Sequence, residues 1–219
     1  MTRHNGIDVS TVQGRIDWSQ VAASGIEFAY VKASEGGKYV DPAFGANASG
    51  ALASGLKVGA YHFLYSQTDP EAQASLFVGT IKNQSLNLPP VVDMETPSPS
   101  AWAVHGGADL IANCLKFCQK VTALTGLVPM IYSYPWYLNS LIGADALAGY
   151  GLWLAVYHTE TVAPTETTNP TVPAPWKTWQ CWQWSGNNGL HVPGIGPVVD
   201  HDVWNGDFPT STQVSACQD

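Results

Sequence analysis

The sequence predicts an α/β fold in which eight strands close into one irregular barrel. Short apolar segments typical of buried strands recur along the chain, and helical segments separate the early ones, as in the βα units of a parallel sheet. The later segments follow one another with little room for helices, which makes the barrel irregular. A chain of 219 residues fits one such barrel, and we therefore expect a single domain over residues 1–219.

The expected strands and helices alternate in the early part of the chain. Strands are expected at residues 6–9, 28–32, 58–63, 91–93, 129–132, 152–156, 179–184 and 198–200. Helices are expected at residues 18–23, 43–54, 70–83 and 108–125, and Asp69 and Pro70 supply the cap and first turn of the third. The Thr- and Pro-rich segment 159–177 is typical of a linker, but aromatic strand-like segments continue beyond it. We therefore expect an ordered loop between two barrel strands there.

Composition and charge narrow the possible functions. Apolar residues make up 45% and charged residues 12% of the chain, as in a folded globular protein. The formal net charge of −8 argues against nucleic acid as a partner, because binding phosphates needs a basic face. No stretch is long and apolar enough to span a membrane. The first ten residues lack the apolar core of a secretory signal, so we expect no signal peptide.

Four cysteines are too few for a disulfide framework in a chain of this length. Cys114 and Cys118 lie one helical turn apart, which favours buried thiols over a bridge or a metal site. A bond between Cys181 and Cys217 stays open at this stage. No spacing of Cys and His resembles a zinc site, and no Gly-rich phosphate-binding loop is present, so we expect neither a metal nor a cofactor.

Two carboxylates, Asp93 and Glu95, directly follow the apolar residues Val91 and Val92. Residues two apart in a strand share a face, so the two acids would stand side by side at the strand end. Two close carboxylates hold their pKa values apart, which gives one protonated acid beside one carboxylate. This pair is what glycoside hydrolysis requires. The alternative, favoured for so short a motif by itself, is a surface strand end with two solvated acids.

Further acidic residues lie at expected strand ends. Asp8 closes the first strand and Asp200 the last, while Asp202 lies on the same face of that segment and is a rival to Asp200. The carboxyl ends of parallel barrel strands gather at one face, where active sites are built, so we expect these acids to converge. A Mg²⁺ or Ca²⁺ site is the rival explanation for such a cluster.

A series of short motifs runs in order along nearly the full chain. They are GIDVS (6–10), QGRIDW (13–18), FAYVKASEG (28–36), GAYHF (59–63), VVDME (91–95), IYS (131–133), LWLA (152–155), WQW (182–184) and VDHDVW (199–204). In these motifs the chain resembles the glycoside hydrolase family 25 lysozymes, the Chalaropsis-type N-acetylmuramidases found among phage endolysins and bacterial autolysins. The resemblance implies a flattened, TIM-like (β/α)5(β)3 barrel with five helices, which agrees with the alternation of elements.

The resemblance also implies roles for the four acids. Glu95 would be the general acid that protonates the leaving glycosidic oxygen, which needs a raised pKa. Asp93 would stabilise the developing positive charge or orient the substrate N-acetyl group. Asp8 and Asp200 would complete an acidic floor that keeps Glu95 protonated. No separate nucleophile is evident, which favours attack by the N-acetyl oxygen of the substrate, while the stereochemical outcome stays open.

Aromatic side chains near strand ends are candidates for stacking on sugar rings, although a core role is as common for any one of them. The residues expected to bind substrate are Tyr61, Phe63, Tyr132, Trp153, Trp184, Glu35 and Asp202. Lys32 is expected to pair with a carboxylate, and His62 to be a buried hydrogen-bonding residue.

The resemblance implies an enzyme that cleaves the β-1,4 bond between N-acetylmuramic acid and N-acetylglucosamine in bacterial peptidoglycan. The alternatives are a carbohydrate-binding barrel without catalysis and a metal-dependent phosphodiesterase. We expect a monomer that acts on glycan strands of the bacterial cell wall, without membrane insertion and without a separate wall-binding domain. Without a signal peptide, holin-dependent phage release or non-classical secretion would bring it to the wall.

Overall fold

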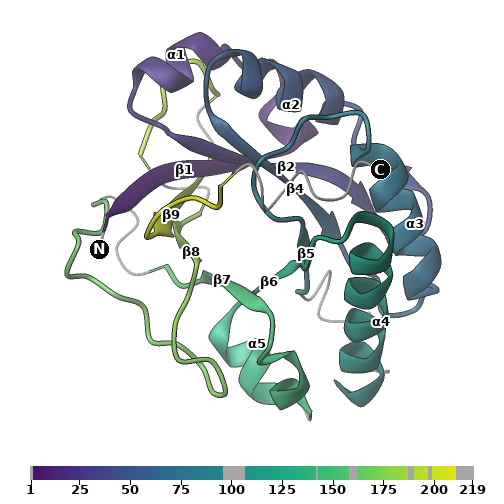
Figure 1. The fold of residues 1–219 in the computed structure, drawn as a ribbon. Coiled ribbons are helices and arrows are strands. Elements are labelled where there is room, and N and C mark those ends of the chain that lie inside the picture. The colour runs from purple at the N-terminus through teal and green to yellow at the C-terminus, as the bar shows by residue number, and fades with distance from the viewer. Residues whose placement is uncertain are drawn as a thin grey trace.

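Eight strands of the protein close into a barrel in the computed structural model (Figure 1), which describes residues 2–95, 107–141, 143–157, 162–186, 190–196 and 199–210. In the order of their pairing, the strands are β1 (Arg3–Val9), β9 (Asp200–Asn205), β8 (Cys181–Ser185), β7 (Gly151–Ala155), β6 (Met130–Ser133), β5 (Val91–Asp93), β4 (Lys57–Phe63) and β2 (Phe28–Glu35). Pairing of β1 with β2 closes the ring, and the two-residue strand β3 (Tyr39–Val40) adds to β2. The predicted eight-stranded barrel is confirmed.

In the described part of the chain, an α-helix follows each of the first five barrel strands. The helices are α1 (Trp18–Ala23), α2 (Phe44–Ala53), α3 (Pro70–Ile81), α4 (Gly107–Thr125) and α5 (Pro135–Ser140), with 3-10 helices η1 (Thr11–Gln13) and η2 (Ala144–Leu147). Asp17 caps α1 and Asp69 caps α3, in which Pro70 occupies the first turn. The sequence does not predict α5, which has the same length as α1 but no capping side chain at its start.

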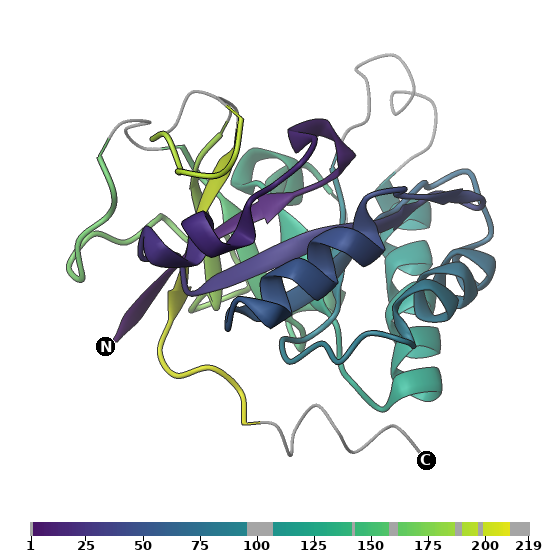
Figure 2. The ribbon, with the colours of Figure 1, turned by 90° about the horizontal axis from the view of Figure 1, so that it is seen from above.

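Apolar side chains form one layer between the barrel and its helices and another inside the barrel. Along β1, Ile7 and Val9 belong to the outer layer, in which α2 packs on β2 and β4 (Figure 2). The inner layer is mainly aromatic and contains Phe28, Tyr30, Tyr132, Trp153 and Trp204. Gly6 is required there, because a Cβ at its position would lie 2.2 Å from the ring of Phe28. These rings fill the barrel below its carboxyl end.

The outer face of β8 and β9 is covered by a loop rather than by a helix. The buried cluster on that face consists of Trp179, Trp182, Trp184 and Val203, and Val172 of the loop packs against it. Arg3 anchors the loop, because its Nη1 donates to the carbonyl oxygen of Thr165 at 2.5 Å. Residues 162–177 therefore form an ordered loop between β7 and β8, as predicted, while residues 159–161 lie outside the described residues.

The last strand corrects one prediction. The segment 198–200 was expected to be a strand that ends at Asp200, whereas β9 begins at Asp200 and runs antiparallel to both β1 and β8. Residues 197 and 198 lie outside the described residues. Because the start of an antiparallel strand lies beside the ends of its parallel neighbours, Asp200 still pairs with Asp8 at the carboxyl end of β1.

Candidate active site

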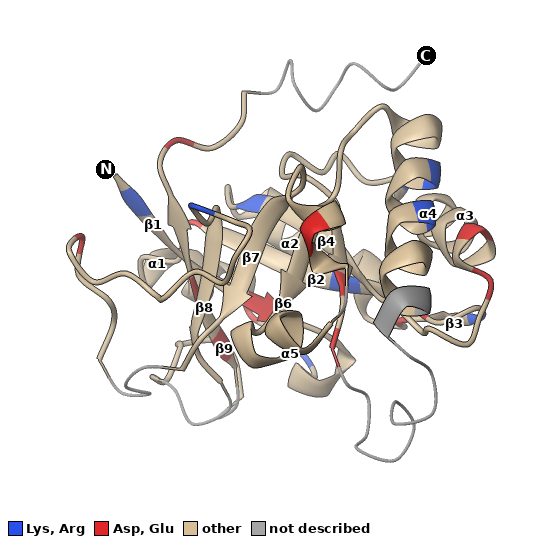
Figure 3. Cartoon of the chain, turned by 90° about the horizontal axis from the view of Figure 1, so that it is seen from below, with Lys and Arg blue, Asp and Glu red and all other residues tan. Residues whose placement is uncertain are grey.

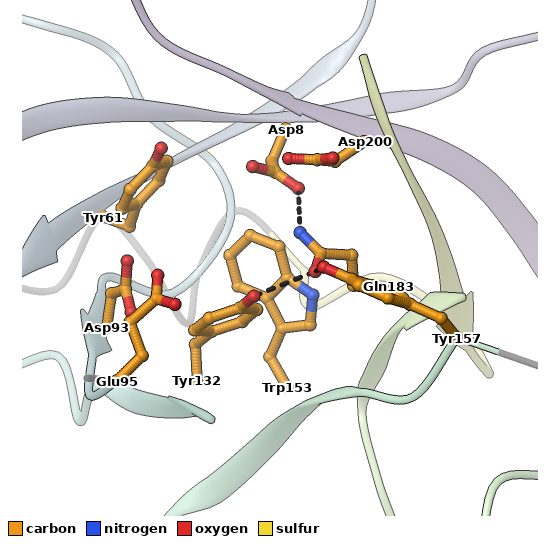
Figure 4. A pocket seen from close by; sticks show the side chains of 9 residues that line it. All are labelled: Asp8, Tyr61, Asp93, Glu95, Tyr132, Trp153, Tyr157, Gln183 and Asp200. Atoms are coloured by element: carbon orange, nitrogen blue, oxygen red, sulfur yellow. Dashed lines mark hydrogen bonds between the residues drawn. The ribbon is translucent and has the colours of Figure 1, made fainter. Parts of the chain in front are cut away.

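A cavity of about 230 Å³ opens at the carboxyl end of the barrel strands (Figure 4). It is lined by Asp8, Tyr61, Asp93, Glu95, Tyr132, Trp153, Tyr157, Gln183 and Asp200. The structure thus brings together the four acids that the sequence predicted to converge. Asp93 and Glu95 lie side by side on one wall, and Asp8 and Asp200 lie together on another. Figure 3 shows acidic positions, coloured red, on strands in the middle of the barrel.

The backbone after β5 presents Asp93 and Glu95 to the cavity. Asp93 ends β5, opposite Phe63 of β4 and Tyr132 of β6. The N–H of Met94 donates to the carbonyl oxygen of Tyr132 at 2.9 Å, and the Ser133 hydroxyl donates to the carbonyl oxygen of Met94 at 2.7 Å. These bonds extend the pairing with β6 by one residue, so that Glu95 follows Asp93 on the same face.

Burial makes both carboxyl groups of this pair hard to ionise. The Asp93 side chain is 5% exposed, and among the described residues no group donates to its Oδ1. Burial, and then the neighbouring Glu95, raise the pKa of Asp93 well above its usual range. Burial also raises the pKa of Glu95 to about 7, with Lys32 opposing the rise and Asp200 adding to it. Glu95 can therefore hold a proton near neutral pH and release it there.

On the opposite side of the barrel, three acids from two strands lie close together, and two of them line the cavity. Asp8 faces Asp200 across the β1–β9 pair, and Asp202 lies two residues further along β9, opposite Gly6. Burial raises the pKa of Asp200 to about 6. Asp202 is 1% exposed and does not line the cavity, because the antiparallel direction of β9 carries it into the barrel below Asp8. Its Oδ1 accepts a hydrogen bond of 2.8 Å from Trp153 Nε1.

Gln183 is a site residue that the sequence analysis did not single out. Its Nε2 donates to Asp8 Oδ2 at 2.7 Å, and its Oε1 accepts from the hydroxyl groups of Tyr132 and Tyr157 at 2.9 and 2.8 Å. Tyr157, one of the aromatic residues near strand ends but not among the predicted substrate-binding residues, is 51% exposed and also lines the cavity. The available signal was the motif Trp182-Gln-Trp184, in which one polar side chain interrupts an aromatic strand and must face the opposite side.

Lys32 and Glu35 lie beside the carboxyl pair rather than in the cavity lining. Lys32 Nζ contacts Glu35 Oε2 at 2.6 Å and lies 5.1 Å from the centre of the Phe63 ring. The Tyr65 hydroxyl also donates to Glu35. Burial opposes ionisation of Glu35, but the bonds from Lys32 and Tyr65 outweigh it and lower the pKa. The predicted pairing of Lys32 with a carboxylate is confirmed.

The structure does not bring all the predicted substrate-binding residues to the cavity. Tyr61, Tyr132 and Trp153 line it, whereas Phe63, Glu35 and Asp202 do not. Trp184 is 3% exposed in the cluster on the outer face of β8, with its ring centre 5.2 Å from that of His201. Trp184 therefore faces away from the barrel interior.

Several buried polar groups outside the cavity lining have structural roles. His62 is buried, its Nδ1 lies 2.8 Å from Ser34 Oγ and its Nε2 3.1 Å from Gln73 Oε1, as expected for a hydrogen-bonded histidine. Cys114, Cys118 and Cys181 are buried free thiols, and Cys217 lies outside the described residues. Within the described ranges, no group of three or more His, Cys, Asp or Glu side chains is arranged to hold a metal ion.

Comparison with known proteins gives consistent matches over most of the chain. The family model described as glycosyl hydrolases family 25 matches residues 7–194. Lysozyme M1 of Streptomyces globisporus is 34% identical over 209 residues, which cover 92% of this chain and 67% of that protein. The N,O-diacetylmuramidase of Chalaropsis sp is 31% identical over 147 residues, which cover 63% of this chain and 69% of that protein. The crystal structure of the bacterial lysozyme from Streptomyces coelicolor superposes with a TM-score of 0.83 at 30% identity, covering 100% of this chain and 98% of that chain.

Proposed function

The chain belongs to glycosyl hydrolases family 25, and we propose that it is a lysozyme that cleaves the β-1,4 bond between N-acetylmuramic acid and N-acetylglucosamine in peptidoglycan. The observation that carries this proposal is the pair formed by Glu95 and Asp93 in the cavity at the carboxyl end of the barrel. One member, Glu95, has a pKa of about 7, and the other, Asp93, presents a buried oxygen to which no described residue donates.

Glu95 acts as the general acid. Its pKa of about 7 leaves a substantial protonated fraction at neutral pH, while the group remains acidic enough to give its proton to the leaving glycosidic oxygen. An unperturbed glutamic acid would be almost fully ionised there. Burial supplies most of the difference, which supports the assignment of the proton donor to this residue.

Asp93 orients the N-acetyl group of the muramic acid residue. Its Oδ1 lacks a donor among the described residues, and a buried acceptor without a partner is costly until a ligand supplies one. The N–H of the acetamido group can donate to this oxygen, which turns the acetamido carbonyl oxygen toward the anomeric carbon. That oxygen forms a bond to the anomeric carbon as the glycosidic bond breaks, and Glu95 protonates the departing oxygen. Water then opens the cyclic intermediate and returns a proton to Glu95.

The remaining cavity residues contact the sugar and contribute charge that affects the pKa of Glu95. Tyr61, Tyr132 and the half-exposed Tyr157 offer ring surface and hydroxyl groups to a glycan strand. Asp200 supplies negative charge that favours protonated Glu95, and Asp8 holds the amide of Gln183. Polyanionic ligands do not suit a cavity of this charge.

The proposed function is tested by clearing of suspensions of purified peptidoglycan, followed as turbidity in the presence and absence of EDTA. We expect clearing that EDTA leaves unchanged. A protein that binds the walls but never clears any wall type is a carbohydrate-binding barrel. Loss of clearing with EDTA, restored by Mg²⁺ or Ca²⁺, identifies a metal-dependent enzyme instead.

We expect opposite pH shifts when the charges that act on Glu95 are removed. A general acid works protonated, so activity falls as the pH rises through its pKa. Lys32 lowers the pKa of Glu95, so Lys32→Met should move the alkaline limb of the pH profile of kcat/KM to higher pH. Asp200 raises that pKa, so Asp200→Asn should move the same limb to lower pH.

Matched controls change the same charges on the surface. Lys82→Met and Asp145→Asn alter exposed residues that do not line the cavity, and their alkaline limbs should coincide with that of the parent. If Lys32→Met and Asp200→Asn shift the limb in the same direction, Glu95 is not the group that titrates there.

We further propose that the enzyme works as a monomer on the glycan strands of the cell wall, reached through a holin pore or by non-classical secretion. Among the described helices, none has the length and apolar content needed to cross a membrane. Expression in a susceptible host with and without a holin tests the first route, since lysis that needs the holin supports it.

Because the net charge is −8, we expect lytic rates that moderate salt does not strongly reduce.

A further inference from the structure

Two carboxyl groups, those of Asp8 and Asp202, lie in hydrogen-bond contact inside the barrel. Both face inward, because the antiparallel register pairs Asp8 with Asp200 and Gly6 with Asp202, which places all four positions on one face. Asp8 forms part of the floor of the cavity, and Asp202 lies below it. Among the described residues, neither forms an ion pair with Lys, Arg or His.

The two carboxyl groups of this pair lack one hydrogen-bond donor. Trp153 Nε1 donates to Asp202 Oδ1, and Gln183 Nε2 donates to Asp8 Oδ2. In the described part of the chain, no N–H or neutral O–H group donates to the buried Asp202 Oδ2. Two ionised carboxylates cannot bond to each other, and burying both without a cation is strongly unfavourable. A proton on one of them supplies the missing donor and removes one of the two charges.

We propose that Asp8 carries this proton and donates it to Asp202, so that Asp202 is a positioning residue that holds Asp8 neutral and fixed in the floor of the cavity. The proposal deepens the proposed function, because it assigns the charge state of one of its site residues. It also revises the expectation that Asp8 adds negative charge near Glu95. The negative charge of this wall resides on the buried Asp202 and on Asp200.

The surroundings favour Asp8 as the protonated member. Asp200 opposes ionisation of both carboxyls but lies directly opposite Asp8, and each carboxyl accepts one N–H bond, Asp8 from Gln183 and Asp202 from Trp153. Burial raises the pKa of both carboxyls, and the hydrogen bond between them raises that of Asp8 and lowers that of Asp202. The other titratable groups near the pair on the packed strands are Asp200 of β9, Cys181 of β8, Tyr30 of β2, Tyr61 of β4 and Tyr132 of β6.

Asparagine substitutions separate the two possible directions of the hydrogen bond. In Asp8→Asn, Nδ2 can donate to Asp202 while Oδ1 accepts from Gln183, so the amide reproduces the hydrogen bonds of a protonated Asp8. In Asp202→Asn, Oδ1 must accept from Trp153, so Nδ2 points at Asp8, which must then ionise. In the double variant the Nδ2 donors of the two amide groups face each other. To avoid this, one amide must turn and lose its hydrogen bond to Gln183 or Trp153.

The test is a 13C NMR titration of carboxyl carbons in Asp-labelled protein, combined with thermal unfolding at pH 7. We expect a protonated Asp signal at pH 7 that disappears in Asp8→Asn and titrates at lower pH in Asp202→Asn. The Tm of Asp8→Asn should stay near that of the parent, that of Asp202→Asn should fall, and the double variant should lose more than the sum. If Asp202→Asn does not fold, the spectra of the parent and of Asp8→Asn show whether Asp8 is protonated at pH 7.

Two results would overturn the proposal. One is a parent spectrum in which Asp8 is ionised at pH 7, whether Asp202 is then ionised or protonated. The other is an Asp8→Asn variant with a Tm as low as that of Asp202→Asn. Neither measurement uses wall hydrolysis, so a failure of the lysozyme assignment would be seen separately in the turbidity assay.

Discussion

Glu95→Gln is expected to reduce peptidoglycan hydrolysis by about 10²–10⁴-fold and to leave the barrel folded. The amide has nearly the shape of the carboxylic acid, but it cannot transfer a proton to the leaving oxygen. Because Glu95 lies partly exposed at the cavity, removal of its charge imposes no packing defect. The loss should appear in kcat over the pH range in which the parent is active, because Gln cannot donate the proton that Glu95 supplies.

Glu71→Gln is the matched control for this variant, because it makes the same change at an exposed position in the first turn of α3. Its hydrolysis rate should equal that of the parent. Thermal unfolding of the Glu95 variant should show a Tm at or above that of the parent, because a partly buried carboxyl with a raised pKa costs stability at neutral pH. A Glu95→Gln enzyme with nearly parental activity would remove Glu95 from its assigned role.

Asp93→Asn is expected to lower kcat by on the order of 10²-fold, because misplacement of a reacting group by about 1 Å has that effect. The amide keeps an oxygen that can accept a hydrogen bond, but its NH2 group brings donors into a buried space built around an acceptor. The acetamido group then turns less often toward the anomeric carbon.

The effect of Asp93→Asn should fall on kcat more than on KM, since orientation matters most in the transition state. The carboxyl of Asp69, which caps α3 on the surface, offers a control at which Asn keeps the capping oxygen. A variant whose KM alone rises would show that Asp93 contributes binding in the ground state and does not orient the reacting group.

Much of the barrel could be predicted because each strand and helix is marked by a pattern in its own short segment of sequence. Each of the early strands is a short apolar segment bounded by a cap or turn, as at Asp17 and Asp69, and the helices between them have recognisable starts. The direction of β9 could not be predicted, because a segment of six residues has the same alternation when read in either direction. The short α5 was not predicted because, unlike α1 of the same length, it has no capping side chain at its start.

The site was predictable where an acid follows an apolar strand, as with Asp8 and Asp93. How deep a residue lies in the barrel could not be predicted from the sequence. Asp200 and Asp202 share a face, and only the antiparallel direction of β9 decides that Asp200 reaches the cavity while Asp202 lies below it. Likewise, alternation places Gln183 opposite to Trp184, but which of the two faces the interior depends on the closure of the whole sheet.

The most direct test of the account identifies the sugar at the new reducing ends of digested peptidoglycan. Purified walls are incubated with the parent enzyme or with Glu95→Gln, reduced with borohydride, hydrolysed and analysed for amino-sugar alcohols. Cleavage by a muramidase that uses Glu95 predicts muramitol in the parent digest and a loss of about 10²–10⁴-fold in the variant digest. Glucosaminitol in the parent digest, or equal muramitol in both digests, would contradict the account.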